Sequence, residues 1–183
     1  MHEGSRSVTR RALAIVCAAL LSGVGTASAA PAPKVSIADF AQLQTPLPYP
    51  YDEKADAAAQ VKAAAARAKA QRKLLLIELG GNWCPDCRIL AGVLELPEVK
   101  AFVRAHYEVV TVDVGRLDKN LQIPARYGIT ERLKGVPALL VVDPVSDRLL
   151  NAGRVTALSD ARRMSPQALA DWLAHWTSPR AAS

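Results

Sequence analysis

Residues 74–88 read LLLIELGGNWCPDCR, an apolar run followed at once by two cysteines three positions apart. A short, nearly continuous apolar run that ends at a glycine pair is typical of a strand buried on both faces. Pro85 suits the first position of a helix and Asp86 suits the positive end of its dipole, so a helix should begin here and run toward Leu96. The stretch therefore predicts a strand leading into a helix that has Cys84 at its N-terminal end.

The position of the two cysteines suits thiol chemistry. The thiolate is the attacking species in disulfide exchange, and a free cysteine with a pKa of about 8.5 is mostly protonated at neutral pH. Unpaired amide donors and the helix dipole stabilise an anion at a helix N-terminus, so we expect Cys84 to be the nucleophile. Cys87 lies one turn further along the same face and can attack a mixed disulfide held on Cys84, so we expect it to be the resolving thiol.

Residues 1–29 have the pattern of a secretory signal peptide. Three arginines precede an apolar run from Ala12 to about Leu21, and small residues at 27–29 suit a cleavage site near Ala29. The run is shorter than the ~20 residues that cross a bilayer, which favours cleavage over the alternative of a membrane anchor. We therefore expect a periplasmic protein with no stable membrane insertion.

Removal of the leader would also remove Cys17 and leave one cysteine pair, which excludes a framework of structural disulfides. A metal site would need about four ligands, and the mature chain adds only His106 and His175 to the cysteines, neither in a ligand motif. We expect no metal and no bound cofactor. The formal charge of +6 is scattered and forms no basic stripe with interleaved aromatic residues, so we expect no nucleic-acid binding.

The mature chain divides into an N-terminal region and one domain. Residues 30–51 hold five prolines, which remove backbone donors and predict an extended arm. Alanine-rich residues 52–72, with Asp52 as a plausible N-cap, predict a helix. We expect this helix to lie on the domain surface through a weakly packing alanine face, with partner binding as the alternative. Residues 73–178 should form the domain and residues 179–183 a tail.

Helix and strand patterns alternate after the cysteines, and the chain has no internal repeat. β-Branched runs predict strands, a glycine closes one helix, and Ser165 with the following proline opens the last. The predicted elements are a helix over 97–106, a strand over 107–114, a helix over 117–127, a hairpin of 138–143 with 148–152, and a final helix from 166 to about 176.

This order resembles the thioredoxin superfamily over about residues 73–176. The features that carry the resemblance are the sequence WCPDC from Trp83 to Cys87, Glu78 six residues before the first cysteine, and Val136-Pro137 some fifty residues after it. The resemblance implies an α/β thioredoxin fold, with a β-α-β unit and a β-β-α unit that form a central mixed sheet flanked by helices. Here it would carry an N-terminal helical extension. Within the superfamily the chain looks most like exported bacterial thioredoxin-like proteins.

The sequence departs from ordinary thioredoxins at three places. Pro85-Asp86 replaces Gly-Pro between the cysteines, Glu78 stands where a buried aspartate is usual, and the helix after the motif lacks the kinking proline. The arm and the helix over 52–72 also look like additions. These differences leave the cysteine pair intact and bear on its potential, partner and direction.

The resemblance also implies roles for the surrounding residues. Glu78, in a leucine-rich strand where burial would raise its pKa, would relay a proton to or from Cys87, unless its side chain reaches solvent. Trp83 would cover the sulfurs, with plain packing as the alternative. Pro137 would be cis and face the cysteines, while the backbone of Val136 pairs with the substrate strand.

The activity expected is that of a monomeric thiol-disulfide oxidoreductase that acts on protein thiols and disulfides with a redox donor in the envelope. A non-catalytic binding module and a peroxidase are the alternatives. Asp86 competes with the Cys84 thiolate for the helix dipole, so it should raise the thiol pKa and favour the reducing direction, with Arg88 as a partial offset. Arg88, Arg132 and Lys134 would either rim the site or form ordinary solvated surface.

Overall fold

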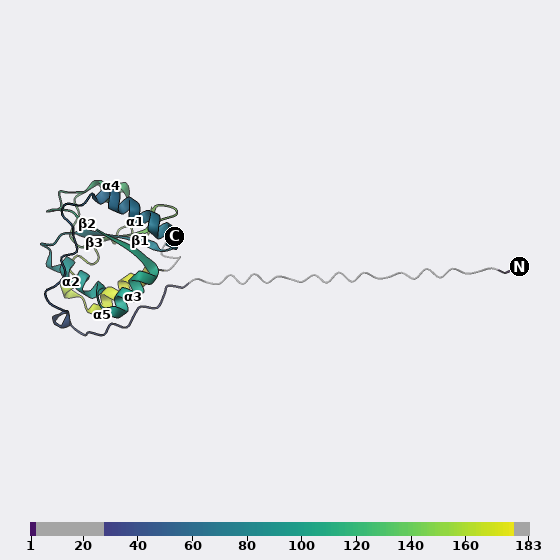
Figure 1. The fold of residues 1–183 in the computed structure, drawn as a ribbon, viewed down its shortest axis with the longest axis horizontal. Helices are drawn as coiled ribbons and strands as arrows, with labels where there is room; N and C mark the ends of the chain where they lie inside the picture. Colours follow the sequence, from purple (N-terminus) through teal and green to yellow (C-terminus); the bar gives the residue numbers. More distant parts are fainter. Residues whose placement is uncertain (3–27, 178–183) are drawn as a thin grey trace.

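The computed structural model describes residues 1–2 and 28–177 (Figure 1). The predicted signal peptide therefore lies almost entirely outside the described residues, as does the predicted tail over 179–183. In the part of the chain that the structure describes, no helix combines the length and the apolar character needed to cross a bilayer.

A four-stranded mixed sheet forms the centre of the domain, in the order β2-β1-β3-β4. The strands are β1 (Leu74–Gly80), β2 (Tyr107–Asp113), β3 (Ala138–Asp143) and β4 (Arg148–Leu149). β1 pairs in parallel with β2 and antiparallel with β3, which places Glu78 opposite Thr111 on one side and Leu139 on the other. β1 is buried along nearly its whole length, as predicted from its continuous apolar run.

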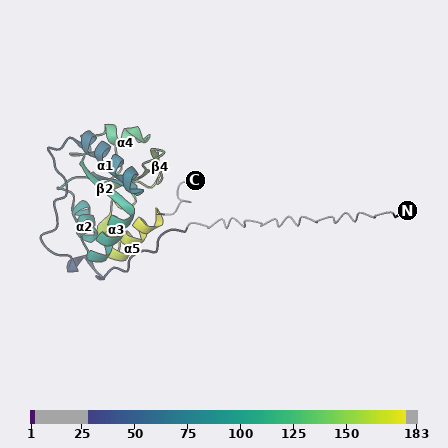
Figure 2. The same cartoon turned by 45° about the vertical axis from the view of Figure 1, so that its right-hand side comes forward.

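Helices cover both faces of the sheet (Figure 1). α1 (Ala57–Gln71) and α4 (Gln122–Arg126) lie on one face, and α2 (Pro85–Leu94), α3 (Pro97–His106) and α5 (Pro166–His175) lie on the other. Figure 2 shows the same two layers from a second direction. The architecture is the α/β thioredoxin fold that the order of motifs implied, and most element boundaries lie within two residues of those predicted.

The alanine face of α1 packs tightly on the sheet. Ala64 and Ala68 are fully buried, because side chains this small let the helix backbone come close to β1 and β2. The helix begins later than predicted, since Asp56 and not Asp52 is its N-cap and accepts a hydrogen bond from Ala59 N at 3.0 Å. The expectation of a weakly packed helix was wrong for its inner face.

Two predicted elements are shorter in the structure. The helix predicted over 117–127 is only α4, because Leu117 (φ 69°) and Asn120 (φ 55°) take left-handed conformations that interrupt it. The second hairpin strand stops at Leu149 and not at residue 152. Beyond it the buried Asn151 side chain bonds β3 in place of a ladder, accepting from Val141 N at 2.9 Å.

The arm over 30–51 is extended, as predicted, and is bound to the domain along much of its length (Figure 1). It passes along the α5, α3 and α2 side and carries one short 3-10 helix, η1 (Phe40–Gln42). Val35 N donates to Gln167 of α5 at 2.9 Å, and buried Leu43 packs over Gly92 of α2. The arm therefore delivers its last residue, Tyr51, to a fixed place in the core.

Candidate active site

Cys84 and Cys87 occupy the N-terminal turn of α2, directly after the turn that follows β1. Cys84 is the N-cap residue, and its Sγ accepts a hydrogen bond from the backbone N–H of Cys87 at 3.2 Å. Both are buried, with relative exposures of 3% for Cys84 and 0% for Cys87. The sulfur of Cys84 therefore lies where the free amides of a helix N-terminus stabilise negative charge.

The environments of the two thiols push their pKa values apart. Hydrogen bonding from the Cys87 side chain lowers the pKa of Cys84, with the Cys87 backbone N–H acting in the same direction against burial. Hydrogen bonding to Cys84 and burial raise the pKa of Cys87, while Tyr51 acts to lower it. Cys84 is thus the thiol that ionises first, and Cys87 retains its proton, an order that the roles expected of a nucleophile and a resolving thiol require.

The loop before β3 lies against Cys84. The Val136–Pro137 peptide bond is cis, and the Cys84 thiol donates to the carbonyl oxygen of Val136 at 3.4 Å. The two residues expected to receive a substrate strand are therefore next to the expected nucleophile.

Glu78 is buried in the middle of β1, with a relative exposure of 1%. Its Oε1 accepts a hydrogen bond of 2.6 Å from the Tyr51 hydroxyl. Burial raises the pKa of Glu78 to about 7, although the hydrogen bond from Tyr51 acts to lower it. Burial also raises the pKa of Tyr51, so this hydroxyl keeps its proton and remains a donor. The alternative of a Glu78 side chain that reaches solvent does not hold.

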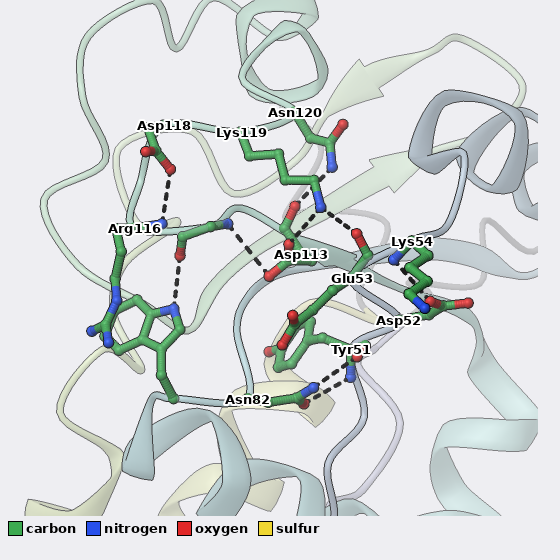
Figure 3. Close-up of polar contacts among 12 residues, drawn as sticks. Tyr51, Asp52, Glu53, Lys54, Asn82, Asp113, Arg116, Asp118, Lys119 and Asn120 are labelled. Carbon is green, nitrogen blue, oxygen red and sulfur yellow. Dashed lines mark hydrogen bonds and ion pairs between the residues drawn. The ribbon is translucent and has the colours of Figure 1, made fainter.

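The end of the arm is fixed by polar contacts with the domain. The Asn82 side chain accepts from Tyr51 N at 3.1 Å and donates to Tyr51 O at 2.8 Å, a reciprocal pair visible in Figure 3. One residue earlier, the carbonyl of Pro50 accepts from Thr111 Oγ1 of β2 at 2.9 Å. The last two residues of the arm are therefore held by the turn that precedes α2, which bonds Tyr51, and by β2, which bonds Pro50.

Asp86 is buried, with a relative exposure of 2%, and binds Arg162 of η2 (Ala161–Arg163). It accepts from Arg162 N at 2.9 Å, and its Oδ2 lies 2.6 Å from a guanidinium nitrogen. The carboxylate still acts to raise the pKa of Cys84, but the net pKa of Cys84 is lowered. The direction predicted for the Asp86 carboxylate is therefore the one observed, although hydrogen bonding from Cys87 outweighs it and keeps the net pKa of Cys84 lowered.

Arg88 does not offset Asp86, contrary to the expectation from its position after the motif. Its guanidinium donates to the carbonyls of Leu47 at 2.8 Å and Pro48 at 3.2 Å, and lies 3.9 Å from the ring centroid of Tyr49. It fastens the arm to α2. The other two cations proposed for a basic rim, Arg132 and Lys134, are exposed surface residues.

Trp83 lies against the loop that follows β2. Its indole N–H donates to Gly115 O at 2.7 Å, and the Arg116 guanidinium stacks 4.5 Å from the ring centroid. The same loop is tied to buried Asp113, which accepts from Lys119 at 3.0 Å. Trp83 is 41% exposed, so it offers an apolar surface beside the cysteines while its contacts hold this loop.

Sequence reasoning missed Tyr51, Asn82 and Arg162. Each meets its partner through a contact between segments that are far apart in the chain, up to 76 residues for Arg162 and Asp86. The sequence held one usable signal, for the partner of Glu78, since a carboxylate predicted to be buried requires a cation or hydrogen-bond donors. Among the described residues, no group of three His, Cys, Asp or Glu side chains is placed to hold a metal ion.

Comparison with known proteins agrees with this geometry. A family model described as thioredoxin-like matches residues 56–144. The match begins at Asp56, the N-cap of α1, and so includes α1. No curated protein sequence matched the chain.

Three solved structures are similar. The crystal structure of a disulphide isomerase from Xylella fastidiosa Temecula1 is 40% identical, with a TM-score of 0.66, over 72% of this chain and 98% of that one. A Pseudomonas aeruginosa protein of unknown function and an HIV epitope scaffold are each 20% identical over 67% of this chain and 84% and 85% of theirs. Their TM-scores are 0.36 and 0.37. With the Xylella structure, the matched residues and the fold in agreement, the chain belongs to the thioredoxin-like family.

Proposed function

We propose that the protein is a thiol-disulfide oxidoreductase that cycles Cys84 and Cys87 between dithiol and disulfide. The observation that carries the proposal is the placement of two neighbouring thiols at one helix N-terminus, where Cys84 Sγ accepts from the Cys87 N–H at 3.2 Å and lies 3.4 Å from the Val136 carbonyl oxygen. The pKa values of the two thiols shift in opposite directions, Cys84 lowered and Cys87 raised, which agrees with this placement. A vestigial or purely structural pair in a non-catalytic binding module has no need of this difference.

The reductive cycle has two steps. The Cys84 thiolate attacks a substrate disulfide, forming a mixed disulfide and releasing one substrate thiolate, which takes up a proton. Cys87 then loses its proton and attacks Cys84 Sγ, which forms the Cys84–Cys87 disulfide and releases the second substrate thiolate, also protonated afterwards. Two electrons pass from the protein dithiol to the substrate, and no bound cofactor is required.

The substrate side of the site combines the exposed ring of Trp83 with the backbone of the loop before β3. We propose that Trp83 contacts the substrate chain and that Val136 and Pro137 receive it beside Cys84, whose thiol already bonds the Val136 carbonyl. Protein disulfides suit such a surface because an extended chain can pair its backbone while its cystine reaches Cys84.

We propose the reducing or isomerising direction. The support is Asp86, which lies in the first turn of α2 and opposes the Cys84 thiolate. Whatever destabilises the reduced thiolate makes a dithiol pair more reducing. The Xylella relative is named a disulphide isomerase, which is consistent with this direction. Pro85, which starts the helix, and Asp86 are thus the residues that tune the potential.

We also propose that the protein acts as a monomer in the periplasm, with a redox donor of the envelope. This rests on the leader pattern in residues 1–29 and on the mildly basic, scattered surface charge.

Reduction of insulin disulfides by dithiothreitol tests the activity. We expect the wild-type protein to accelerate the reaction, and Cys84→Ser and Cys87→Ser each to abolish the acceleration. If both variants accelerated the reaction as well as the wild type, the assignment to this cysteine pair would fail, and a wild type without any acceleration would favour the binding-module alternative. Expression of Cys87→Ser in the native envelope should then trap substrates on Cys84 as mixed disulfides that mass spectrometry can identify.

A further inference from the structure

The Tyr51 hydroxyl is a buried polar group that the cycle above does not use. It donates to Glu78 Oε1 at 2.6 Å, and Tyr51 as a whole is 3% exposed. The hydroxyl and the Cys87 sulfur share the space above Gly80: a Cβ on that glycine would lie 2.3 Å from Tyr51 Oη and 2.8 Å from Cys87 Sγ. The hydroxyl therefore lies beside both the carboxylate and the resolving thiol.

We propose that Tyr51, the last residue of the N-terminal arm, bridges Cys87 and Glu78 and carries the proton between them. The proposal rests on the proposed function, since it concerns the second step of the Cys84 and Cys87 cycle. Through this bridge the arm takes a direct part in the chemistry of the domain, although the sequence alone predicts the arm and the domain as separate regions.

The bridge moves one proton without a net change at the tyrosine. As Cys87 attacks the mixed disulfide, its S–H proton passes to Tyr51 Oη while the Tyr51 O–H proton passes to Glu78 Oε1. Cys87 is left as the thiolate that forms the new S–S bond, Glu78 is left protonated, and Tyr51 is again a neutral phenol. Tyr51 must be a neutral phenol to donate its proton to Glu78. Burial raises the pKa of Tyr51 and so keeps it neutral.

Glu78 can pass the proton on to water. It lines a cavity of about 210 Å³ beneath the arm, whose walls include Pro48, Pro50 and Thr111. A water molecule occupies about 30 Å³ of liquid, so this space has room for several. The cavity therefore offers the path by which Glu78 exchanges its proton between cycles.

Few charged groups lie close enough to Glu78 to affect its pKa. The arm contributes the neutral Tyr51, α2 contributes the Cys87 thiol, and the strand neighbours of Glu78, Thr111 and Leu139, carry no charge. Three other charged residues line the cavity, and all three are exposed: Glu95, Lys100 and Arg104. Glu95 and Lys100 form an ion pair of 2.6 Å. Within residues 28–177, Tyr51 is thus the one side chain that hydrogen-bonds the Glu78 carboxylate.

The test separates the two chemical steps with dithiobis(nitrobenzoate). One coloured thiolate is released when Cys84 attacks the reagent, and a second is released when Cys87 resolves the mixed disulfide. Loss of a hydrogen bond to a charged group shifts a pKa by about one to two units. We therefore expect Tyr51→Phe to slow the second release about tenfold or more at pH 7 and to move its pH midpoint upward, while the first release keeps its wild-type rate.

Two controls exclude a general loss of packing. Tyr107 is equally buried and donates to Leu173 O at 2.6 Å on another part of the sheet, so Tyr107→Phe should leave both releases unchanged. If proton flow runs from Tyr51 to Glu78, adding Tyr51→Phe to Glu78→Gln should slow the second release no further. Multiplying effects in the double variant, or equal slowing by Tyr107→Phe, would overturn the bridge.

The failures of the two proposals are distinguishable. A wild-type protein that gives one release only would contradict the Cys84 and Cys87 cycle itself. A wild type with both releases and a Tyr51→Phe variant whose second release matches it from pH 6 to pH 9 would overturn the bridge alone. If Tyr51→Phe does not fold, Asn82→Ala, which frees the Tyr51 backbone, must slow the second release selectively, and an unchanged second release would likewise overturn the bridge.

Discussion

Glu78 and Asp86 are two buried carboxylates near the same cysteine pair, with relative exposures of 1% and 2%, and the structure treats them differently. Among the described residues, Glu78 is paired with the neutral hydroxyl of Tyr51, whereas Asp86 binds the guanidinium and the backbone N–H of Arg162. Burial alone therefore does not decide what a carboxylate does. The partners differ as well, since Glu78 receives a neutral donor and the charge of Asp86 is compensated by a cation.

This difference assigns separate tasks to the two residues. With its pKa raised to about 7 by burial, Glu78 can accept a proton and release it again under physiological conditions. Asp86 instead ties the start of α2 to η2 and adjusts the field at Cys84. Glu78 therefore serves proton transfer in the site, and Asp86 adjusts the redox potential of the cysteine pair.

The largest expected effect is on stability, through Glu78. Its folded pKa of about 7 lies above the ordinary value of 4.5, so its contribution to stability is fully present below about pH 4.5 and is lost as the pH rises toward 7. The loss amounts to about 3 kcal/mol at pH 8. Since Glu78→Gln cannot ionise and can still accept from Tyr51, we expect its free energy of unfolding, relative to the wild type, to rise by this amount between pH 4 and pH 8.

Urea unfolding of both proteins at these two pH values measures the difference, with the cysteines kept reduced. Changes in other titrating groups cancel because they occur in both proteins. Parallel pH profiles for the wild type and Glu78→Gln would mean that Glu78 keeps an ordinary pKa, and the contrast with Asp86 would disappear.

The next effect is on the redox potential, through Asp86. Because the carboxylate opposes the Cys84 thiolate, Asp86→Asn should lower the thiol pKa and make the equilibrium potential against glutathione less negative, by about 30 mV for each 1.4 kcal/mol. Arg162→Met is the matched variant with the opposite expected effect. It leaves the Asp86 charge uncompensated and should therefore make the potential more negative. Shifts of the same sign in the two variants would refute the electrostatic account.

The smallest effect belongs to Arg88, which the sequence had suggested as the counter-charge of Asp86. Its bonds run to the arm carbonyls, so Arg88→Ala should leave the potential at its wild-type value and cost about 1 kcal/mol in the docking of the arm. Hydrogen exchange should show faster exchange of amides in residues 46–51. A potential shifted as far as that of Asp86→Asn would restore Arg88 to the site.

Much of the fold was readable from local pattern. The apolar run of β1, the helix starts at Pro85, Pro97 and Pro166, and the strand over 107–113 all follow from rules that act within a few residues, and the structure confirms them. The helix predicted over 117–127 failed because left-handed residues at 117 and 120 wrap the chain around Asp113, to whose carbonyl Asn120 donates at 2.8 Å.

The same limit applies to the site. The cysteines could be identified because their spacing and local setting carry the chemistry, whereas Glu78 and Pro137 were identified through the resemblance to the thioredoxin superfamily. Tyr51 and Arg162 could not, since Tyr51 reaches Glu78 across 27 residues and Arg162 reaches Asp86 across 76. These tertiary contacts fix which carboxylate is neutralised, and no periodicity in the sequence records them.

The most direct test of the account is a redox titration of the wild-type protein against glutathione, with alkylation and peptide mass spectrometry at Cys84 and Cys87. We predict that the two thiols disappear together as one two-electron couple, in a single intramolecular disulfide, at a potential well below the roughly −120 mV of the strongest periplasmic oxidants. Independent oxidation of the two cysteines, or both thiols still free under fully oxidising buffer, would contradict the proposed cycle. A single couple near −120 mV would keep the cycle and contradict its reducing direction.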